Sequence, residues 1–532
     1  MVDPTSPQSR ALPRRGLLKA AAAGLIAAPF VLRSGLVLAQ GRADPFALGV
    51  ASGDPSPDGF VLWTRLAPDP LAPDGGGGLT GGVRVDWEVA EDAAMSRVVR
   101  RGAAVADDRF AHSVHIEVAG LKPGRPYWYR FMSMGARSPV GRAMTAPARG
   151  TKLDRLRFCF ASCSNWEAGY FSAYRHMAQE QPDLVLFLGD YIYEFSHGPG
   201  EDVARRHDRQ GEIKDLVAYR NRYALYRTDP DLQALHAAAP CLMTWDDHEV
   251  QNDYANRWSQ NLGVSEADFL ARRAAAYQAY YEHMPLRRRS EPHGPDMRVY
   301  DRLRFGDLVE FSVLDGRQYR TIQPCALPST RRGHVADPAC TERTDPSRTM
   351  LGFAQERWLY DGFKASTARW NVIAQDLLIT SVGQKDARTG MLGHWTDGWD
   401  GYPATRTRML AAVASSKVRN PVFLGGDIHS FWTTDLKANF DDPGSATVAT
   451  EFVGTSVTSD GPDYDLIAQT LPQNPQVKFF DSRARGYVGV EVTPGRMETR
   501  FQAISDRRDP HATVSTLKRW VVESGKAGAV EA

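Results

Sequence analysis

The stretch Leu184-Val-Leu-Phe-Leu-Gly-Asp-Tyr-Ile-Tyr193 is an apolar run that ends abruptly in a glycine and potential metal ligands. Five consecutive apolar residues followed by such a break are typical of a buried strand. Three more stretches have the same form: Phe158–Asn165, Cys241–Glu249 and Val422–His429. In α/β sheets, functional side chains gather just beyond the carboxyl ends of the strands. If the four runs lie side by side, the pattern predicts a metal site at one edge of a sheet.

The region from about residue 153 onward has the alternation of an α/β domain. A strand at 156–161, a helix at 167–180 and a strand at 184–188 form a crossover unit, so the two strands are expected to be parallel and adjacent. Ser265, followed three residues later by Asp268, predicts the start of a helix that continues to about His283. Further strands are predicted at 308–314, 370–377, 421–424, 487–492 and 497–501.

The region 45–148 has a different pattern, typical of a small all-β domain. Residues 61–66, 83–89 and 113–118 alternate with a period of two, as half-buried antiparallel strands do. Leu121-Lys-Pro-Gly124 followed by Tyr127 resembles the tyrosine corner of fibronectin-III and immunoglobulin-like sandwiches. We expect this domain to have a packing or positioning role, because it carries no catalytic grouping.

The N-terminal segment, residues 1–39, has the form of an export signal. Arg14-Arg15-Gly-Leu-Leu-Lys19 precedes a short uncharged stretch, and Val37-Leu-Ala39 offers a cleavage site. The paired arginines resemble a twin-arginine signal, which implies export of the folded chain by the twin-arginine translocation machinery to the periplasm or beyond. An ordinary secretory signal or a membrane anchor is the alternative. The stretch is short for a comfortable membrane span, so no integral span is expected.

The composition is that of an ordinary globular protein. The 532 residues are 42% hydrophobic and 24% charged, with a formal net charge of +1. That charge gives no electrostatic argument for a stable nucleic-acid partner, and we expect a monomer. Cys325 and Cys340 flank a Pro/Arg/Gly-rich loop and are predicted to form a disulfide in an oxidising compartment.

The four clusters differ in their ligand chemistry. A thiolate at Cys163, a phenolate at Tyr193 and an imidazole at His429 suit a transition ion, for which ferric iron is the best match. Asp247, Asp427 and Asn252 offer only oxygen, which suits Ca²⁺, Mg²⁺ or Mn²⁺. Asp190 could bridge the two ions, as carboxylates do in two-metal phosphoryl hydrolases. His248 is placed to donate a proton to the leaving oxygen of a phosphate ester.

The ordered motifs carry a family resemblance over nearly the whole chain after the signal. Cys163-Ser-Asn, Gly189-Asp-x-x-Tyr193, Trp245-Asp-Asp-His-Glu249 and Gly426-Asp-x-His429 resemble those of PhoD-type alkaline phosphatases, calcineurin-like metallophosphoesterases related to the purple acid phosphatases. The resemblance implies an α/β (α+β) catalytic domain over 153–525 with a β-sandwich core flanked by helices. It also implies hydrolysis of phosphomonoesters, and of diesters, by metal-activated hydroxide.

The same resemblance implies a ligand set. Fe³⁺ would be held by Cys163, Asp190, Tyr193 and His429, and Ca²⁺ by Asp190, Asp427 and the segment from Asp247 to Asn252. Mn²⁺ or Mg²⁺ at the second position stays open. His248 and Asp190 are the expected catalytic residues. Arg317 is a third candidate, as a phosphate clamp, and a structural salt bridge is its alternative.

Rival functions fit the sequence less well. A cysteine phosphatase would need an arginine six residues after Cys163, where Gly169 stands, and a serine hydrolase would need a Gly-x-Ser-x-Gly elbow, which is absent from the sequence. A non-enzymatic binding protein would not need the complete ligand set. Within phosphoester chemistry, a phospholipase-D-like diesterase acting on lipid or teichoic-acid head groups remains the alternative.

Overall fold

The computed structural model describes residues 43–386, 389–442 and 444–532. The predicted export signal, residues 1–39, lies outside these ranges. Within them, no helix is both long enough and apolar enough to cross a membrane.

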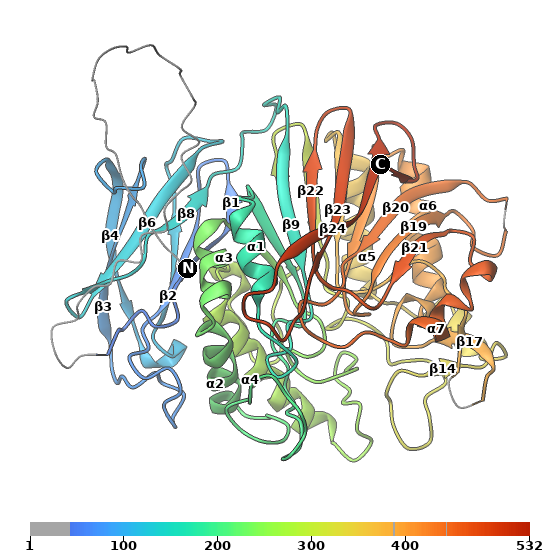
Figure 1. The fold of residues 1–532 in the computed structure, drawn as a ribbon, viewed down its shortest axis with the longest axis horizontal. Helices are drawn as coiled ribbons and strands as arrows, with labels where there is room; N and C mark the ends of the chain where they lie inside the picture. Colours follow the sequence, from blue (N-terminus) through green and yellow to red (C-terminus); the bar gives the residue numbers. More distant parts are fainter. Residues whose placement is uncertain (1–42, 387–388, 443) are drawn as a thin grey trace, which may run out of the picture. The chain divides into compact units, whose positions relative to one another are not determined.

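Ten strands form the first of two large sheets (Figure 1). Its order is β25-β24-β23-β22-β9-β10-β11-β1-β2-β5. The central strands β9 (Leu156–Ala161), β10 (Leu184–Leu188) and β11 (Cys241–Thr244) are parallel, which confirms the predicted crossover unit. The other strands are β1 (Val50–Ser56), β2 (Gly59–Arg65), β5 (Ser113–Val118), β22 (Arg485–Val492), β23 (Arg496–Ile504), β24 (Val514–Glu523) and β25 (Val530–Glu531).

Seven strands form the second large sheet, in the order β12-β13-β15-β18-β20-β19-β21. Strands β13, β15, β18 and β20 are mutually parallel, and antiparallel strands lie at both ends. Their bounds are β12 (Asp301–Phe305), β13 (Val309–Val313), β15 (Trp370–Ala374), β18 (Pro421–Gly425), β19 (Phe431–Lys437), β20 (Thr447–Val453) and β21 (Val477–Asp481). The strands predicted at 308–314, 370–377 and 421–424 are thus present.

The two sheets pack face to face around an apolar core. Alternate residues of β9 serve two layers: Phe158 and Phe160 face the second sheet, whereas Cys159 packs with the helices outside. The Phe158 ring lies edge-on to Phe311 of β13, with 5.3 Å between the ring centroids. Because side chains of a strand alternate between its faces, a continuous apolar run fits a strand covered on both sides. The sheets form the expected β-sandwich core.

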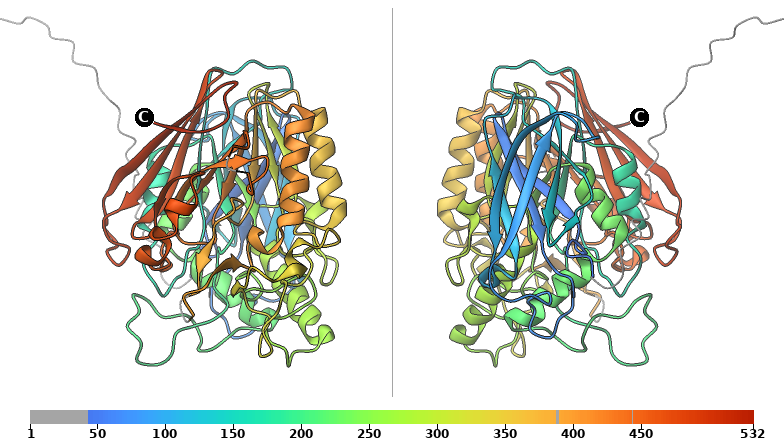
Figure 2. Two further views of the ribbon diagram at one scale, coloured as in Figure 1. Left: turned by 90° about the vertical axis from the view of Figure 1, so that its right-hand side faces the viewer. Right: turned by 90° about the vertical axis from the view of Figure 1, so that its left-hand side faces the viewer.

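Helices cover both outer faces of this sandwich (Figure 2). One group packs on the first sheet, and α5 and α6 pack on the second. Ser265 caps α4, accepting a hydrogen bond from the Asp268 N–H at 3.1 Å, as predicted. The bounds are α1 (Ser172–Gln179), α2 (Leu216–Arg227), α3 (Pro230–Ala238), α4 (Glu266–His283), α5 (Gly352–Ala365), α6 (Pro403–Ser416) and α7 (Tyr464–Ala468). Short 3₁₀ helices span Asp108–Phe110, Arg288–Ser290, Thr341–Thr344, Trp399–Gly401 and Leu471–Gln473.

Long loops around the sandwich carry one small sheet, in the order β14-β17-β16. Its strands are β14 (Val335–Ala336), β16 (Gln384–Lys385) and β17 (Leu392–Trp395). The loop that contains β14 is closed by the predicted disulfide between Cys325 and Cys340.

The N-terminal strands form a sandwich that shares a sheet with the rest of the chain. A five-stranded sheet packs against β1, β2 and β5 around an apolar core. Tyr127 Oη accepts the Lys122 N–H at 3.0 Å, as a tyrosine corner does. Strand β1 pairs with β11 through Gly53 and Cys241, so the first large sheet continues into this region. The strands of the five-stranded sheet are β3 (Val83–Ala90), β4 (Val98–Ala106), β6 (Pro126–Ser133), β7 (Ala136–Arg137) and β8 (Gly141–Met144).

Candidate metal centre

The central strands of the first sheet bring three of the four predicted ligand clusters to one edge. Strands β9, β10 and β11 are in register, with Phe160 opposite Leu186 and Leu186 opposite Leu242. The fourth run, β18, differs from the side-by-side expectation, because it lies in the second sheet. Its loop nevertheless meets the others: a Cβ on Gly426 would lie 2.4 Å from Ser162 Oγ. The site therefore spans one end of the sandwich, between the two sheets.

The turns that carry the ligands are conformationally strained. Non-glycine residues rarely adopt positive φ, and clusters of such residues mark functional sites. A side chain at Gly189, whose φ is +90°, would collide with Asp246, since their Cβ atoms would be 2.4 Å apart. Positive φ occurs at Cys163 (61°), Asp190 (51°), Asp427 (62°) and His429 (49°).

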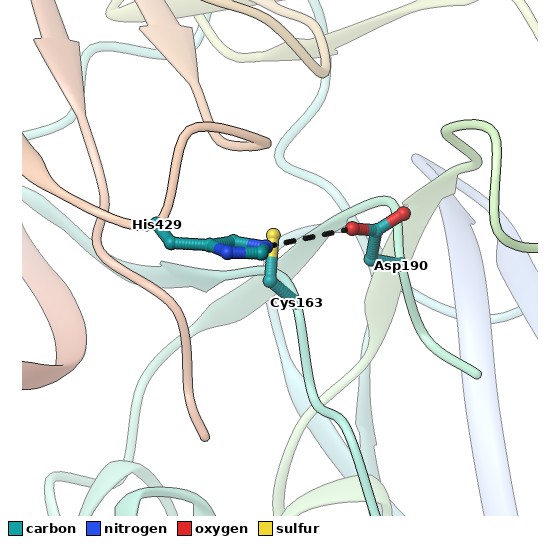
Figure 3. A group of neighbouring side chains, drawn as sticks. All are labelled: Cys163, Asp190 and His429. Atoms are coloured by element: carbon teal, nitrogen blue, oxygen red, sulfur yellow. Dashed lines mark ion pairs between the residues drawn. The ribbon is translucent and has the colours of Figure 1, made fainter. Parts of the chain in front are cut away.

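Four predicted ligands of the first ion come together at this end. Ligand atoms of Cys163, Asp190 and His429 all lie within 4.8 Å of one another (Figure 3). The phenol of Tyr193 joins them, with Oη 3.0 Å from Asp190 Oδ2 and 3.2 Å from His429 Nε2. All four side chains are largely or fully withdrawn from solvent. The group comprises one sulfur, one nitrogen and two kinds of oxygen donor.

A backbone carbonyl fixes the orientation of His429. Its Nδ1 lies 2.6 Å from the Asp460 carbonyl oxygen, which can only accept a hydrogen bond. Nδ1 therefore carries the ring proton, and the lone pair of Nε2 points toward Tyr193 and Asp190. Burial lowers the pKa of His429 to about 4, so the ring is neutral at ordinary pH. A neutral imidazole held by its second nitrogen is the form that binds metals.

The thiol and the phenol need a nearby cation to become good ligands. Burial, together with the Asp190 carboxylate, raises the pKa of both Cys163 and Tyr193 well above their usual values. A metal ion reverses this effect by stabilising thiolate and phenolate. Asp190 Oδ1 is buried without a hydrogen-bond partner, which leaves a lone pair free for such an ion. The residues present therefore fit a metal.

A second group beside the first contains only carboxylates. Oxygen atoms of Asp246, Asp247 and Asp427 lie within 4.8 Å of one another, and Asp190 and Asp247 form a further group with His248. Asp246 Oδ2 and Asp247 Oδ1 are buried without hydrogen-bond partners. Asp190 is thus the residue common to the mixed group and the group around Asp247. Unpartnered carboxylate oxygens in a buried position fit a hard divalent cation.

The candidate proton donor His248 is held by a buried carboxylate that follows Tyr193 in the chain. His248 Nδ1 lies 2.6 Å from Glu194 Oε2, and Glu194 Oε1 accepts the Asn252 N–H at 2.7 Å. Burial opposes the charged imidazolium, but Glu194, Asp190 and Asp247 outweigh it and raise the pKa of His248 well above its usual value. His248 is therefore cationic over a wide pH range.

Comparison with known proteins agrees with this arrangement. A family model described as "PhoD-like phosphatase" matches residues 158–501, and one described as "PhoD-like phosphatase, N-terminal domain" matches residues 33–147. The chain belongs to the PhoD-like phosphatase family. It is 45% identical over 491 residues to alkaline phosphatase D of Bacillus subtilis (strain 168), covering 91% of this chain and 82% of that protein. The solved structure of PhoD matches with a TM-score of 0.85 at 44% identity, covering 93% of each chain. The chain is therefore a hydrolase of phosphate esters.

In this PhoD-like phosphatase, Asn252 stays a predicted ligand of the second ion through its side-chain oxygen. Its side-chain amide donates to Gln260 Oε1 at 3.1 Å. The next residue, Asp253, forms a further group with Asp247 and Asp397. Sequence reasoning missed Asp253 and Asp397, because both come from loops without the strand-end pattern.

Glu249 has a role that the motif left unassigned. Glu249 accepts hydrogen bonds from the backbone N–H groups of Asp190 at 3.1 Å, Tyr191 at 2.6 Å and Asp246 at 2.9 Å. It therefore ties the turn after β10 to the turn after β11. This role explains why a carboxylate follows His248. The only sign of it in the sequence is that Glu249 is adjacent to His248.

Arg317, the candidate phosphate clamp, lies among the buried carboxylates of the centre. Its side chain is fully buried, and its guanidinium is held between carboxylates. Nε contacts Asp246, and Nη1 lies 2.6 Å from Asp397 Oδ2. An arginine committed to buried ion pairs is not free to approach a substrate from solvent. These ion pairs agree with the structural alternative for Arg317, and its role as a phosphate clamp stays a prediction.

Proposed function

We propose that this PhoD-like phosphatase hydrolyses phosphomonoesters and phosphodiesters at alkaline pH through a ferric ion and a calcium ion that share Asp190. The observation that supports this proposal is the position of Asp190, which belongs to the mixed thiol–imidazole group and also to the group around Asp247. A carboxylate has two oxygens and can serve one ion with each. Asp190 Oδ1 has no hydrogen-bond partner, which agrees with that use.

The two ions differ in the donor atoms that would hold them. Cys163, Tyr193, His429 and Asp190 would hold Fe³⁺, because thiolate, phenolate and imidazole favour a transition ion. Asp190, Asp247 and Asp427 would hold Ca²⁺, with Mn²⁺ or Mg²⁺ as substitutes, because the donors are hard oxygens. When bound, the two ions supply an activated nucleophile and positive charge that compensates the phosphate oxygens.

The protein's own groups orient the reaction and supply the proton. His248 is the proton donor to the leaving oxygen, because the surrounding carboxylates keep it cationic. Its ring lies against Tyr193, with 4.2 Å between the centroids, which places it at the border between the two groups. A donor that stays protonated at high pH is suited to an alkaline enzyme. Metal ions can compensate the charge on the oxygens of a singly charged phosphodiester as well as that of a doubly charged monoester. The proposal therefore includes diesters.

Metal analysis and paired assays test the proposal. We expect about one iron and at least one calcium per chain in the purified protein, and hydrolysis of both p-nitrophenyl phosphate and bis-p-nitrophenyl phosphate. EDTA should abolish activity, and calcium should restore it. Full activity in a preparation free of iron and calcium would contradict the metal assignment. Activity on the monoester alone would remove diesters from the proposal.

The proposal also includes export of a monomer through the twin-arginine route. It rests on Arg14-Arg15 and the apolar stretch that follows. Replacing both arginines with lysine should keep the enzyme in the cytoplasm, as measured by cell fractionation. Gel filtration with light scattering would test the monomer.

A further inference from the structure

The candidate ligands of the first ion come from both large sheets. Cys163 and Tyr193 follow strands β9 and β10 of the first sheet, whereas His429 follows β18 of the second. Hydrogen bonds between strands join neighbours within one sheet, so they do not fix the turns of one sheet relative to those of the other. Contacts between the turns must therefore hold His429 in place against Cys163 and Tyr193.

The loop after β20, in the second sheet, contacts all three of these ligands. The Asp460 carbonyl oxygen lies 2.6 Å from His429 Nδ1. Ser459 Oγ lies 2.6 Å from the phenol oxygen of Tyr193 and 3.2 Å from the Cys163 carbonyl oxygen. The position of this loop therefore affects the orientation of both the imidazole and the phenol.

Arg507 holds this loop from the first sheet. It lies between strands β23 and β24, and its guanidinium contacts the loop at two points. Nη1 donates to the Thr458 carbonyl oxygen at 2.7 Å, and Nη2 lies 2.5 Å from Asp460 Oδ1. Thr458 and Asp460 flank Ser459 in the chain, so one guanidinium holds the segment that reaches the ligands.

The backbone of Arg507 is itself fixed. Its carbonyl oxygen accepts the Tyr170 N–H at 2.8 Å. A Cβ on Gly169 would lie 2.5 Å from the same oxygen, so the close approach of the two backbones requires glycine at this position. Gly169 and Tyr170 belong to the segment between Cys163 and helix α1. Arg507 therefore connects the segment that follows the thiol with the loop that holds the imidazole.

A second arginine, Arg485 on β22, holds a different part of the same region. Its side chain is buried, and Nη1 donates to the backbone carbonyl oxygens of His429 at 2.7 Å and Ser459 at 3.0 Å. Arg485 thus fixes the main chain of the histidine turn. Arg507 instead holds Asp460, whose carbonyl oxygen accepts the hydrogen bond from the ring of His429.

We propose that Arg507 is a positioning residue of the iron site: by holding Asp460 it fixes the ring of His429 relative to the ligands of the first sheet. This inference rests on the proposed function, because it concerns the same iron site. Arg507 acts through the loop after β20 and is not itself a ligand in the proposed set.

Arg507→Met should weaken iron binding and leave calcium binding unchanged. The variant keeps much of the side-chain length but loses both contacts, so the His429 ring is no longer held. Iron affinity should fall by about tenfold, the lower end of the effect of groups that orient metal ligands. Among the described residues, the ion pair of Arg507 is with Asp460 and not with a carboxylate of the second group, so calcium affinity should not change.

The stability of the fold should change little in the same variant. The side chains of Arg507 and Asp460 are 23% and 82% exposed, and exposed ion pairs contribute little to stability. Competition with a chelator measures the iron affinity, calorimetric titration the calcium affinity, and thermal unfolding of the full chain the stability. Loss of a merely structural contact would not weaken iron binding alone.

Two further variants test the pair and its position. Asp460→Asn removes the charge that pairs with Arg507 but keeps the carbonyl oxygen beside His429, so it should also weaken iron binding. Since both changes act through one contact, the double variant should bind iron no more weakly than Arg507→Met. Arg508→Met is the matched control, because Arg508 is the next residue and pairs with Asp202 at 2.7 Å. It should bind iron as the wild type does.

Hydrogen exchange in the chelated protein tests the positioning without a metal. The N–H groups of residues 457–459 donate to the carbonyl oxygens of Ser162 and Cys163, so their exchange reports whether the loop stays on the first sheet. Arg507→Met should speed this exchange several-fold, and Arg508→Met should not. Mass spectrometry of the loop peptide measures the rates.

The outcomes separate this inference from the proposed function. Equal losses of iron and calcium affinity in Arg507→Met would show damage to the whole centre and overturn the inference, as would an unchanged iron affinity. Unchanged exchange of the loop would overturn it without reference to any metal. A wild-type protein that binds no iron would instead contradict the proposed function.

Discussion

Ser459 donates a hydrogen bond from its Oγ to the phenol oxygen of Tyr193, at 2.6 Å. The same hydroxyl lies 3.2 Å from the carbonyl oxygen of Cys163, and both serine and tyrosine are buried. Ser459 belongs to the loop after β20 (Thr447–Val453). The loop thus reaches the candidate iron position through one hydroxyl group, although none of its residues is a ligand in the proposed set.

Ser459→Ala should change the visible absorption of the iron-loaded enzyme. A hydrogen bond to a phenolate stabilises its electrons, so loss of the bond makes transfer of an electron to ferric iron easier. We expect the charge-transfer band to move to longer wavelength and the activity to fall by about tenfold. Absorption spectroscopy of the purified variant measures the shift. Ser459→Thr keeps the hydroxyl and should restore the band, and an unshifted band in Ser459→Ala would contradict the assigned contact.

Glu194→Gln should lower the pH at which activity is lost on the alkaline side of the pH profile. Glu194 is one of the groups that raise the pKa of His248, so neutralising it lowers that pKa. His248 then loses its proton at a lower pH, and the alkaline limb of kcat/KM for p-nitrophenyl phosphate should move down by about one unit or more. In the folded state the raised pKa favours imidazolium. Its contribution to stability is therefore present below about pH 6.5 and lost as the pH rises through the folded-state pKa.

A surface pair of the same kind provides the control for this experiment. His197 Nδ1 lies 2.8 Å from Glu201 Oε2, in an exposed position. Exposed ion pairs contribute little, so Glu201→Gln should leave the pH profile of kcat/KM unchanged. If both variants shift the alkaline limb equally, the limb does not report His248.

The strand ends were predictable from the sequence, but their distribution over two sheets was not. An apolar run that ends in glycine and a ligand is a local pattern, and Asp190 follows β10 as predicted. The pairing of β18 with β15 and β20 depends on contacts between residues far apart in the chain. No local pattern specifies that choice. The same limit applies to Asp253 and Asp397, whose proximity to Asp247 is created by tertiary packing.

Helices α2, α3, α5, α6 and α7 were not predicted, and on α2 and α6 arginines occupy inward positions that apolar residues usually fill. On α2, Arg220 is paired with Glu282, and Arg222 with Asp208. Arg227, at the end of the same helix, lies over the Trp63 ring at 3.9 Å. These arginine side chains are buried, so the inward face of the helix lacks the continuous apolar stripe from which an amphipathic helix is predicted. On α6, Arg406 is paired with Asp400 in the same way.

Replacing individual ligands should remove the two ions unequally. Cys163→Ser should lose iron but keep calcium, because the thiol belongs only to the mixed group. Asp190→Asn should lose both, because Asp190 is the shared carboxylate. Replacing a group that only hydrogen-bonds to a metal ligand costs about 10–100-fold in metal affinity or activity. Replacing a ligand itself should therefore cost more than about a hundredfold. Elemental analysis together with the p-nitrophenyl phosphate assay separates the two variants.

Cys159→Ala is the matched control for these ligand changes. Cys159 is buried and free like Cys163, but it packs with the helices on the outer face of the first sheet. The variant should lose some stability and retain both ions. Equal loss of iron in Cys159→Ala and Cys163→Ser would show that the effect comes from the fold and not from ligation.

The disulfide between Cys325 and Cys340 should support the carboxylate side of the centre. The loop that it closes carries Gly333, whose N–H donates to Asp253 Oδ2 at 2.9 Å. Replacing both cysteines with serine removes a cross-link across 15 residues and should lower the free energy of unfolding by about 3 kcal/mol. Because Asp253 loses part of its support, calcium should also bind several-fold more weakly, whereas iron content should be unchanged. Denaturant titration and calcium titration, with and without a reductant, measure both effects. A reductant should affect only the wild type, and equal sensitivity in the double-serine variant would place the effect elsewhere.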